Sequence, residues 1–323
     1  MRVLVTGGAG FIGSHLVDKL VEKGFQVRVL DDLSTGSLDN LEHSLNRIEF
    51  IKADVRDVDS VRKALEGVDV VVHEAAVTSV PRSIEDPLTV SQVNVEGTLN
   101  LLRACVERKV RRFVYASSSS VYGDLPTLPK REDYELRPKS PYAVSKYAGE
   151  KYCLVFHEVY GLETVALRYF NVYGPRQRYG PYSGVITIFI NRALRGEPPI
   201  IYGDGKQTRD FIYVEDVVEA TIKALEKEDV AGEVINVAAG SPVTINRLAE
   251  LILEIVGIDN LKPIYTVERK GDIKHSFADI TKAKSLLGWS PKVNLVEGLR
   301  RTVDWFKVKL EQYPSGYLSH YRH

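Results

Sequence analysis

The sequence predicts an α/β fold, a doubly wound parallel sheet of the Rossmann type with a smaller mixed α/β subdomain toward the C-terminus. Short apolar segments alternate with amphipathic, helix-like segments up to Arg168. A glycine-rich turn joins the first apolar segment to the first helix, and the alternation gives way to turn-rich sequence after Tyr169. Strands that alternate with helices in this way form parallel sheets.

Composition limits the classes of function. The chain has 323 residues, of which 44% are hydrophobic and 27% charged, as in ordinary globular proteins. Its 43 basic and 43 acidic residues give no net charge that would favour nucleic acid or an anionic membrane. Cys105 and Cys153 lack a Cys-x-x-Cys spacing, so we expect neither a disulfide scaffold nor a metal site. With no signal-like or membrane-spanning stretch, we expect a cytoplasmic protein.

The glycine-rich turn predicts a dinucleotide site. Residues 2–5 form the first predicted strand, and a helix to about residue 23 follows the turn. Gly7, Gly10 and Gly13 would allow a tight turn, a close approach to a pyrophosphate and packing of helix on sheet. The phosphates would lie at the helix N-terminus, where amide groups and the helix dipole favour negative charge. The alternative, a plain strand-to-helix turn, is disfavoured by this position in the chain.

Acidic residues at the next two strand ends indicate which dinucleotide. The strand at 26–30 runs into Asp31 and Asp32, about 20 residues after the glycines, where an acid can accept both ribose hydroxyls of NAD and repel the 2′-phosphate of NADP. No arginine adjoins Asp31, which favours NAD. Asp54 and Val55 follow the strand at 48–52, where we expect the aspartate to face the adenine. The alternative for Asp31 is a solvated turn aspartate.

The fourth strand, 68–73, leads into a segment of small residues. Ala75 and Ala76 would let the backbone pass close to the cofactor. His73, at the strand end, is interpreted as structural rather than catalytic. A long helix is predicted at 87–108, and Asn94 in its interior is expected to hold a backbone distortion or to touch the cofactor loop.

The catalytic candidates lie between the fifth strand and the next helix. The strand at 111–116 brings the serines at 117–120 to the C-terminal edge of the sheet, where ligands bind in such folds. A helix then begins at Pro141, so Tyr142 and Lys146 are four residues apart and share a face. An ammonium beside a phenol should lower the tyrosine pKa from about 10 and make it a base for a sugar or alcohol hydroxyl. A chance pair is the alternative.

The remaining elements complete the expected organisation. A sixth strand at 162–168 precedes a predicted substrate loop at 170–184, and the chain has no internal repeat. The further predictions are a helix at 185–195, a strand at 199–202, a loop at 203–210, a helix at 214–226, a strand at 232–237 that rejoins the sheet, C-terminal pieces at 244–256, 262–267 and 294–309, and a loosely held tail at 313–323. We expect an NAD-binding domain at 1–170 that 214–240 rejoins, and a substrate-binding subdomain of 171–213 and 241–323.

Together, these motifs resemble the extended short-chain dehydrogenase/reductase family of nucleotide-sugar enzymes, and most of all its UDP-hexose 4-epimerases. The glycine turn, the serines before Val121-Tyr122-Gly123, the Tyr142–Lys146 pair and the segment around Gly271-Asp272 carry the resemblance. It implies that Tyr142 is the base, that Lys146 lowers its pKa and holds the nicotinamide ribose, and that Ser118 assists. It also implies a homodimer that pairs the helices at 87–108 and 141–160 into a four-helix bundle.

The resemblance implies two sets of contact residues. The expected NAD contacts are Gly7, Gly10, Phe11, Ile12, Gly13, Asp31, Asp32, Asp54, Val55, Ala75, Ala76, Asn94, Tyr142, Lys146 and Tyr169. The expected UDP-sugar contacts are Ser118, Tyr142, Asn171, Val185, Tyr202, Arg209, Arg269, Asp272 and Ser276. The two arginines could give charge-assisted hydrogen bonds to a pyrophosphate, although either alone could be a solvated surface charge.

Three serines indicate which reaction and which sugar. Related dehydratases and decarboxylases place an acid where this chain has Ser119 and Ser120, and without it a 4-keto sugar can only receive its hydride back after turning over, which is 4-epimerisation. Ser276 stands at a gatekeeper position, where a small residue leaves room for an N-acetyl group. The resemblance therefore implies UDP-N-acetylglucosamine/galactosamine together with UDP-glucose/galactose. A UDP-glucuronate 4-epimerase is the alternative, and a non-catalytic NAD-binding sensor a remote one.

Overall fold

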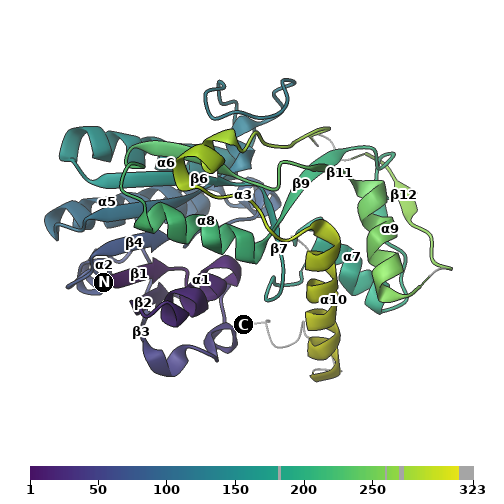
Figure 1. Cartoon of the computed structure of the whole chain (residues 1–323), viewed down its shortest axis with the longest axis horizontal. Coiled ribbons are helices and arrows are strands. Elements are labelled where there is room, and N and C mark those ends of the chain that lie inside the picture. Colours follow the sequence, from purple (N-terminus) through teal and green to yellow (C-terminus); the bar gives the residue numbers. More distant parts are fainter. Residues whose placement is uncertain (181–182, 259, 269–272, 313–323) are drawn as a thin grey trace.

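The computed structural model describes residues 1–180, 183–258, 260–268 and 273–312. A parallel sheet with the strand order β10-β6-β5-β4-β1-β2-β3 forms its centre (Figure 1). The seven strands are β1 (Arg2–Thr6), β2 (Gln26–Asp31), β3 (Ile48–Lys52), β4 (Val70–His73), β5 (Arg112–Ser118), β6 (Glu163–Tyr169) and β10 (Glu233–Val237). This confirms the predicted fold class, and it confirms that the strand near 232–237 rejoins the sheet beside β6.

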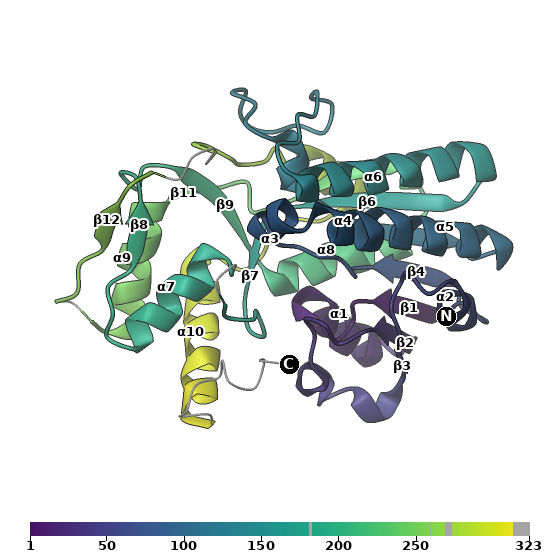
Figure 2. The ribbon, with the colours of Figure 1, turned by 180° about the vertical axis from the view of Figure 1, so that it is seen from behind.

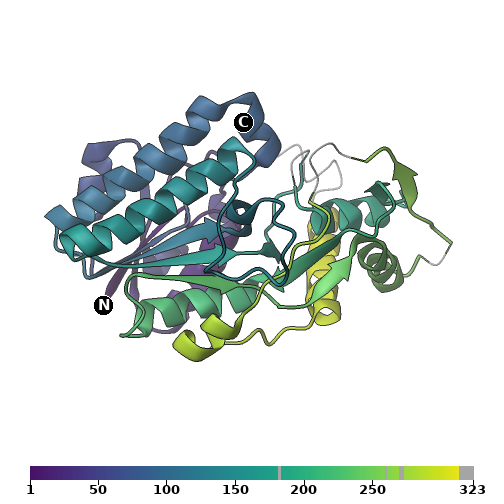
Figure 3. The ribbon, with the colours of Figure 1, turned by 90° about the horizontal axis from the view of Figure 1, so that it is seen from above.

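Helices cover both faces of this sheet, as Figure 3 shows from above. They are α1 (Phe11–Glu22), α2 (Val58–Ala64), α3 (Val80–Glu85), α4 (Pro87–Ser91), α5 (Gly97–Glu107), α6 (Pro141–Tyr160) and α8 (Val214–Glu226). Helices α1 and α8 pack together on one face, whereas α5 and α6 lie side by side on the other. Because crossover connections bury both faces, the strands have almost continuous apolar sequences.

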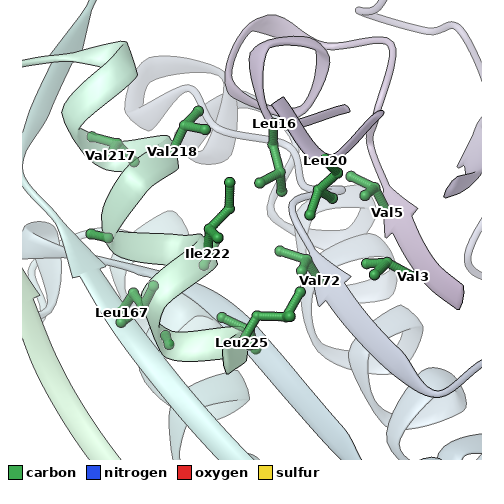
Figure 4. Packing of buried hydrophobic residues seen from close by; sticks show 14 of the residues in the cluster. Val3, Val5, Leu16, Leu20, Val72, Leu167, Val217, Val218, Ile222 and Leu225 are labelled. Carbon is green, nitrogen blue, oxygen red and sulfur yellow. The ribbon is translucent and has the colours of Figure 1, made fainter. Parts of the chain in front are cut away.

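The core follows the two-residue repeat of the strands. Val3 and Val5 face α1 and α8, where Leu16 and Ile222 meet them (Figure 4), while Leu4 between them points to the opposite core. All five side chains are at most 1% exposed. Burial of each such side chain stabilises the fold by roughly 1.5–3 kcal/mol. The cores on the two faces of the sheet therefore hold its C-terminal edge, on which the site is built, in place.

The smaller region lies beyond that edge, at the left of Figure 2. Helices α7, α9 and α10 pack on one another beside two small sheets, of order β11-β9-β7 and β12-β8. The elements are β7 (Asn171–Tyr173), α7 (Val185–Leu194), β8 (Ile200–Tyr202), β9 (Thr208–Tyr213), β11 (Pro242–Thr244), α9 (Ile245–Val256), β12 (Ile264–Thr266) and α10 (Leu295–Gln312). Within the described ranges, no helix is long and apolar enough to cross a membrane.

Several sequence predictions are corrected here. The loop expected at 170–184 contains β7, which pairs with the end of β9, and the loop expected at 203–210 contains the start of β9, which pairs with β11. Both strands depend on partners distant in the chain rather than on a local pattern. Helices α2 and α3 were not predicted. The helix expected at 87–108 is divided into α4, a π-helical turn η3 (Gln92–Glu96) and α5. The tail at 313–323 lies outside the described residues.

Candidate active site

The glycine turn brings β1, α1 and the segment after β4 into close contact. Gly7 has a φ of +69°, and a Cβ added to it would lie 2.7 Å from the amide nitrogen of Ala75. A Cβ on Gly13 would lie 2.2 Å from the carbonyl oxygen of Gly7. Helix α1 begins at Phe11 with no side-chain cap at Gly10 and no acid in its first turn. This is the arrangement that suits a phosphate at a helix N-terminus.

Asp31 lies directly beside the glycine turn. Its Oδ2 accepts a hydrogen bond of 2.9 Å from the amide of Ala9, and its Oδ1 one of 2.8 Å from Leu33. Desolvation raises its pKa, while these two hydrogen bonds oppose the rise. Asp32 is exposed and accepts from Ser34. The acid at the end of β2 is therefore held at the place where a ribose would follow the phosphates, so the site fits a dinucleotide.

The adenine candidates at the end of β3 have other partners in this structure. Asp54 pairs with Arg56 at 2.6 Å, and this hydrogen-bonded pair lowers the pKa of the carboxyl. The side chain of Val55 is buried against Gly97, whose added Cβ would lie 2.5 Å from it. Val55 thus packs α5 on the sheet, and its contact with a cofactor stays a prediction.

Asn94 occupies the π-helical turn, which confirms the predicted backbone distortion. Its Oδ1 accepts from the amide of Val77 at 2.8 Å, and its Nδ2 donates to the carbonyl of Val77 at 3.0 Å. The same Nδ2 lies 2.9 Å from Oγ of Ser145 on α6. Asn94 therefore holds the segment of Ala75 and Ala76 in place and joins it to the helix that carries Tyr142.

His73 is structural, as predicted. The Thr98 hydroxyl donates to the carbonyl of Asn94 at 2.6 Å, so the Nε2–H of His73 must donate to Thr98 Oγ1 at 2.9 Å. Nδ1 of His73 then accepts from the Thr6 hydroxyl at 2.6 Å. Burial lowers the pKa of His73 to about 3, which keeps the ring neutral. A ring fixed by two threonines has no free nitrogen for chemistry.

Successive side chains of β5 point to opposite faces of the sheet, so neighbouring serines have different surroundings. Ser117 points away from the site and donates to Glu150, which forms a buried ion pair of 2.7 Å with Arg168. Ser118 points to the site and hydrogen-bonds to the phenol of Tyr142. Oγ of Ser120 is shielded from solvent and has no hydrogen-bond partner among the described residues. An unpartnered hydroxyl beside Ser118 is what a polar ligand would satisfy.

Tyr142 and Lys146 lie in the first turns of α6, which Ser140 caps by accepting from Ala143 at 3.1 Å. Lys146 is buried and its Nζ donates to the carbonyl of Ala116 at 2.8 Å. Tyr142, Lys146 and Ser118 are thereby brought to one place at the C-terminal edge of β5, as predicted.

The predicted electrostatics of this pair are wrong for this structure. Desolvation raises the pKa of Tyr142, the bond from Ser118 lowers it, and the charge of Glu74 raises it further. Lys146 does not reverse this, because its ammonium is directed at Ala116 and desolvation lowers its own pKa to about 8. Burial, which the prediction did not consider, is the larger cause of the difference, and the acidic neighbour adds to it.

Glu74 is the site residue that sequence reasoning missed. Its Oε1 accepts from the hydroxyl of Tyr169 at 2.8 Å, and that hydroxyl also lies 2.8 Å from Thr221 Oγ1 on α8. Desolvation raises the pKa of Glu74 to about 7, while the bond from Tyr169 and the charge of Lys146 lower it. The available signal was an acid at the C-terminal end of β4, immediately before two alanines.

The expected sugar-nucleotide contacts converge on β9. Nδ2 of Asn171 donates to the carbonyl of Asp210 at 3.0 Å, Arg209 lies on the same strand, and the amide of Ser276 donates to Thr208 at 3.2 Å. The Asp210 carboxylate accepts amides of the 239–240 and 278 segments and so ties these loops together. Desolvation raises the pKa of Asp210 to about 6.

The other predicted UDP-sugar contacts either belong to α7 and β8 or lie outside the described residues. Val185 is the first residue of α7, and Tyr202 is 37% exposed on β8. Arg269 and Asp272 lie outside the described residues. Within the described part of the chain, no group of three or more His, Cys, Asp or Glu side chains could hold a metal ion.

Comparisons with known proteins agree with this geometry. The model of the NAD dependent epimerase/dehydratase family matches residues 3–238. The UDP-glucose 4-epimerase of Mycolicibacterium smegmatis is 42% identical over 96% of this chain and 99% of its own. A Thermotoga maritima UDP-glucose 4-epimerase, solved with UDP-glucose, is 43% identical with a TM-score of 0.92, covering 96% of this chain and 100% of its own.

A second solved structure is equally similar. It is the UDP-N-acetylglucosamine 4-epimerase of Methanobrevibacter ruminantium in complex with UDP-N-acetylmuramic acid, which is 45% identical with a TM-score of 0.91. The match covers 95% of this chain and 98% of that one. From its glycine turn to β10, in sequence and in fold, this chain belongs to the NAD dependent epimerase/dehydratase family.

Proposed function

We propose that the protein is an NAD-dependent isomerase that inverts the 4-hydroxyl of a UDP-hexose. The observation that carries the proposal is the convergence of Ser118, Tyr142 and Lys146 at the sheet edge beside the glycine turn. The similarity to two enzymes named as UDP-sugar 4-epimerases supports the same reaction.

In this proposal each residue has a defined task. Tyr142, as phenolate, accepts the proton of the sugar 4-hydroxyl and later returns it, and the Ser118 hydroxyl stabilises the phenolate by its hydrogen bond. Lys146, fixed by Ala116, would contribute a positive charge that offsets part of the cost of burying the phenolate, without reversing it. Bound NAD supplies the hydride acceptor, and then the donor, at the same carbon. The glycine turn and Asp31 would hold this cofactor.

The reaction stops at epimerisation because the end of β5 carries serines in place of an acid, and Glu74, the acid at the end of β4, is engaged with Tyr169. Ser119 and Ser120 cannot exchange a proton near neutral pH as a carboxyl group can, so elimination from a 4-keto sugar lacks its catalyst. The sugar can then only take back its hydride, on either face. We propose that residues 171–213 and 241–323 hold the UDP group, so that the sugar ring remains free to rotate.

For the sugar, we propose the N-acetylated pair together with the non-acetylated pair. Ser276 is half-buried next to β9, and its small side chain leaves volume near the sugar. One similar structure is named for UDP-N-acetylglucosamine and another contains UDP-glucose. A UDP-glucuronate 4-epimerase is the second candidate, since the unpartnered Ser120 hydroxyl could donate to a sugar carboxylate.

One assay tests these assignments. Purified protein with added NAD is incubated separately with UDP-glucose, UDP-N-acetylglucosamine and UDP-glucuronate, and the 4-epimers are separated by chromatography. We expect turnover of the first two. Turnover of the glucuronate alone would select the second candidate, whereas turnover of none would contradict the proposed function.

We also propose that the protein is a cytoplasmic homodimer paired through the helical region at 87–108, which comprises α4, η3 and α5, and through α6, which lies beside it in Figure 2. This surface carries exposed apolar side chains, including Leu88 at 76% and Val159 at 65%. Large apolar patches mark protein interfaces. Light scattering should give twice the mass of 36.2 kDa, and a Leu88→Glu variant should be monomeric.

A further inference from the structure

Glu74 interacts with groups from three other elements. Its carboxylate accepts from Tyr169 at the end of β6, and Tyr169 contacts Thr221 on α8. The carboxylate of Glu74 also interacts electrostatically with Tyr142 and with Lys146, both on α6. The preceding residue, His73, stays neutral. The charge of Glu74 is thus exerted on the two groups to which we assign proton transfer.

Counting hydrogens shows which protonation state this arrangement favours. Three links of 2.8 Å connect Glu74 to Tyr169, Tyr169 to Thr221, and Thr221 to the carbonyl of Val217. Each link needs one hydrogen, but the two hydroxyls supply two. A protonated Glu74 supplies the third, because it donates to Tyr169, which donates to Thr221, which donates to Val217. With an ionised Glu74, one link has no hydrogen.

We propose that Glu74 is a positioning residue that holds a proton at the end of this hydroxyl relay and thereby controls the negative charge facing Tyr142 and Lys146. The relay is Glu74–Tyr169–Thr221. A protonated Glu74 leaves the phenolate form of Tyr142 unopposed, whereas an ionised Glu74 repels it and stabilises the ammonium of Lys146. The inference rests on the proposed function only in naming Tyr142 as the base.

Two variants should act in opposite directions. A carboxyl group with a pKa of about 7 is ionised in the alkaline range where a tyrosine ionises. Glu74→Gln removes that charge and keeps a donor for Tyr169, so Tyr142 should ionise at a pH lower by about one unit, the scale expected for two charges several ångströms apart. Thr221→Val leaves Tyr169 only Glu74 to donate to, which favours the ionised carboxylate near neutral pH, so the rising limb of the kcat profile should move to higher pH.

The experiment is an absorbance titration of tyrosinate in the full-length protein, with the Tyr142→Phe variant of each background subtracted to isolate Tyr142. It needs no turnover, so its result is independent of the proposed function. The pH dependence of kcat is measured in parallel, and its rising limb should move to lower pH in Glu74→Gln and to higher pH in Thr221→Val. Glu132→Gln is the matched control, because desolvation also raises the pKa of Glu132 and its carboxylate bonds to Asn236 on β10 rather than to a residue of α6.

A tyrosinate titration shifted to lower pH in Glu74→Gln, together with a kcat limb shifted to higher pH in Thr221→Val and no shift in Glu132→Gln, would support the proposal. Coincident titration curves for Glu74→Gln and wild type would overturn it, as would equal shifts in the control. If Glu74→Gln does not fold, a pH dependence of kcat in Thr221→Val that coincides with the wild type overturns the relay on its own.

Discussion

Asn94 and Ser145, 51 positions apart in the chain, are joined by a buried hydrogen bond of 2.9 Å. The bond connects the π-helical turn to α6, and the other two bonds of Asn94 hold Val77. The π-helical turn therefore positions two parts of the site. It holds the segment that follows β4, through Val77, and it holds α6, which carries Tyr142.

The first prediction concerns this contact. Asn94→Ala leaves the half-buried amide and carbonyl of Val77 without their partner and should lower the free energy of unfolding by roughly 1–3 kcal/mol. NAD content after purification should fall as well. Urea unfolding and cofactor extraction measure the two effects. Asn100→Ala, whose side-chain bonds are 3.3 and 3.4 Å long, is the control and should have less than half the effect on stability.

Removing the phenol hydroxyl should abolish turnover without unfolding the protein. Tyr142→Phe lacks the group that exchanges the proton, so kcat should fall by a factor of roughly 10² to 10⁴. Thermal unfolding should be nearly unchanged, because Tyr142 is half-buried. Tyr147→Phe, one turn further along α6, should keep wild-type activity. A Tyr142→Phe enzyme with near-normal kcat would remove Tyr142 from the mechanism.

Gly13→Ala tests the close approach in the glycine turn. The added Cβ would lie 2.2 Å from the Gly7 carbonyl oxygen, so the turn must move. We expect a loss of roughly 1–3 kcal/mol in stability and of bound NAD, measured by unfolding and by cofactor extraction. Gly184→Ala is the control, since its nearest neighbour would be 3.4 Å away and its φ of −60° suits alanine. Equal effects in both would mean that the close contact is unimportant.

The neutral His73 predicts a pH dependence of stability. An unfolded histidine binds a proton near pH 6.5, whereas folding lowers the pKa of His73 to about 3. The unfolded chain therefore binds more protons below pH 6.5, and stability falls as the pH falls from 6.5 toward 3. Between pH 7 and 5 the wild type should lose about 2 kcal/mol more than His73→Gln does.

Urea unfolding of both proteins at the two pH values measures this difference. The variant of an exposed histidine, His43→Gln, should behave like the wild type. Equal losses in wild type and His73→Gln would show that His73 takes up a proton in the folded state.

A bulky residue at 276 should narrow the range of sugars. Ser276→Tyr should lower kcat/KM for UDP-N-acetylglucosamine by at least about tenfold relative to UDP-glucose, because it fills the volume proposed for the N-acetyl group. Parallel assays with both substrates give this ratio. Lys274→Tyr, at an exposed position two residues earlier, should leave the ratio unchanged. An unchanged ratio in Ser276→Tyr would contradict the gatekeeper role.

The sequence predicts the parallel sheet, the glycine turn and the Tyr142–Lys146 pair well because each depends on a local pattern. It could not predict β7 and β9, whose pairing joins residues about 40 positions apart, as in Asn171 with Phe211. It also could not predict the influence of Glu74 on Tyr142, which depends on how three elements meet. The raised pKa of Tyr142 follows from burial, which a sequence does not contain.

The path of the chain between its two regions has a practical consequence. The chain leaves the large sheet after β6, returns through α8 and β10, and leaves again for β11. A single cut cannot separate the regions, because β10 would lose its place beside β6 or β9 its neighbour β11. Substrate specificity should thus be transferred between relatives by substituting individual side chains rather than by exchanging whole segments. Neither region should fold when it is expressed alone.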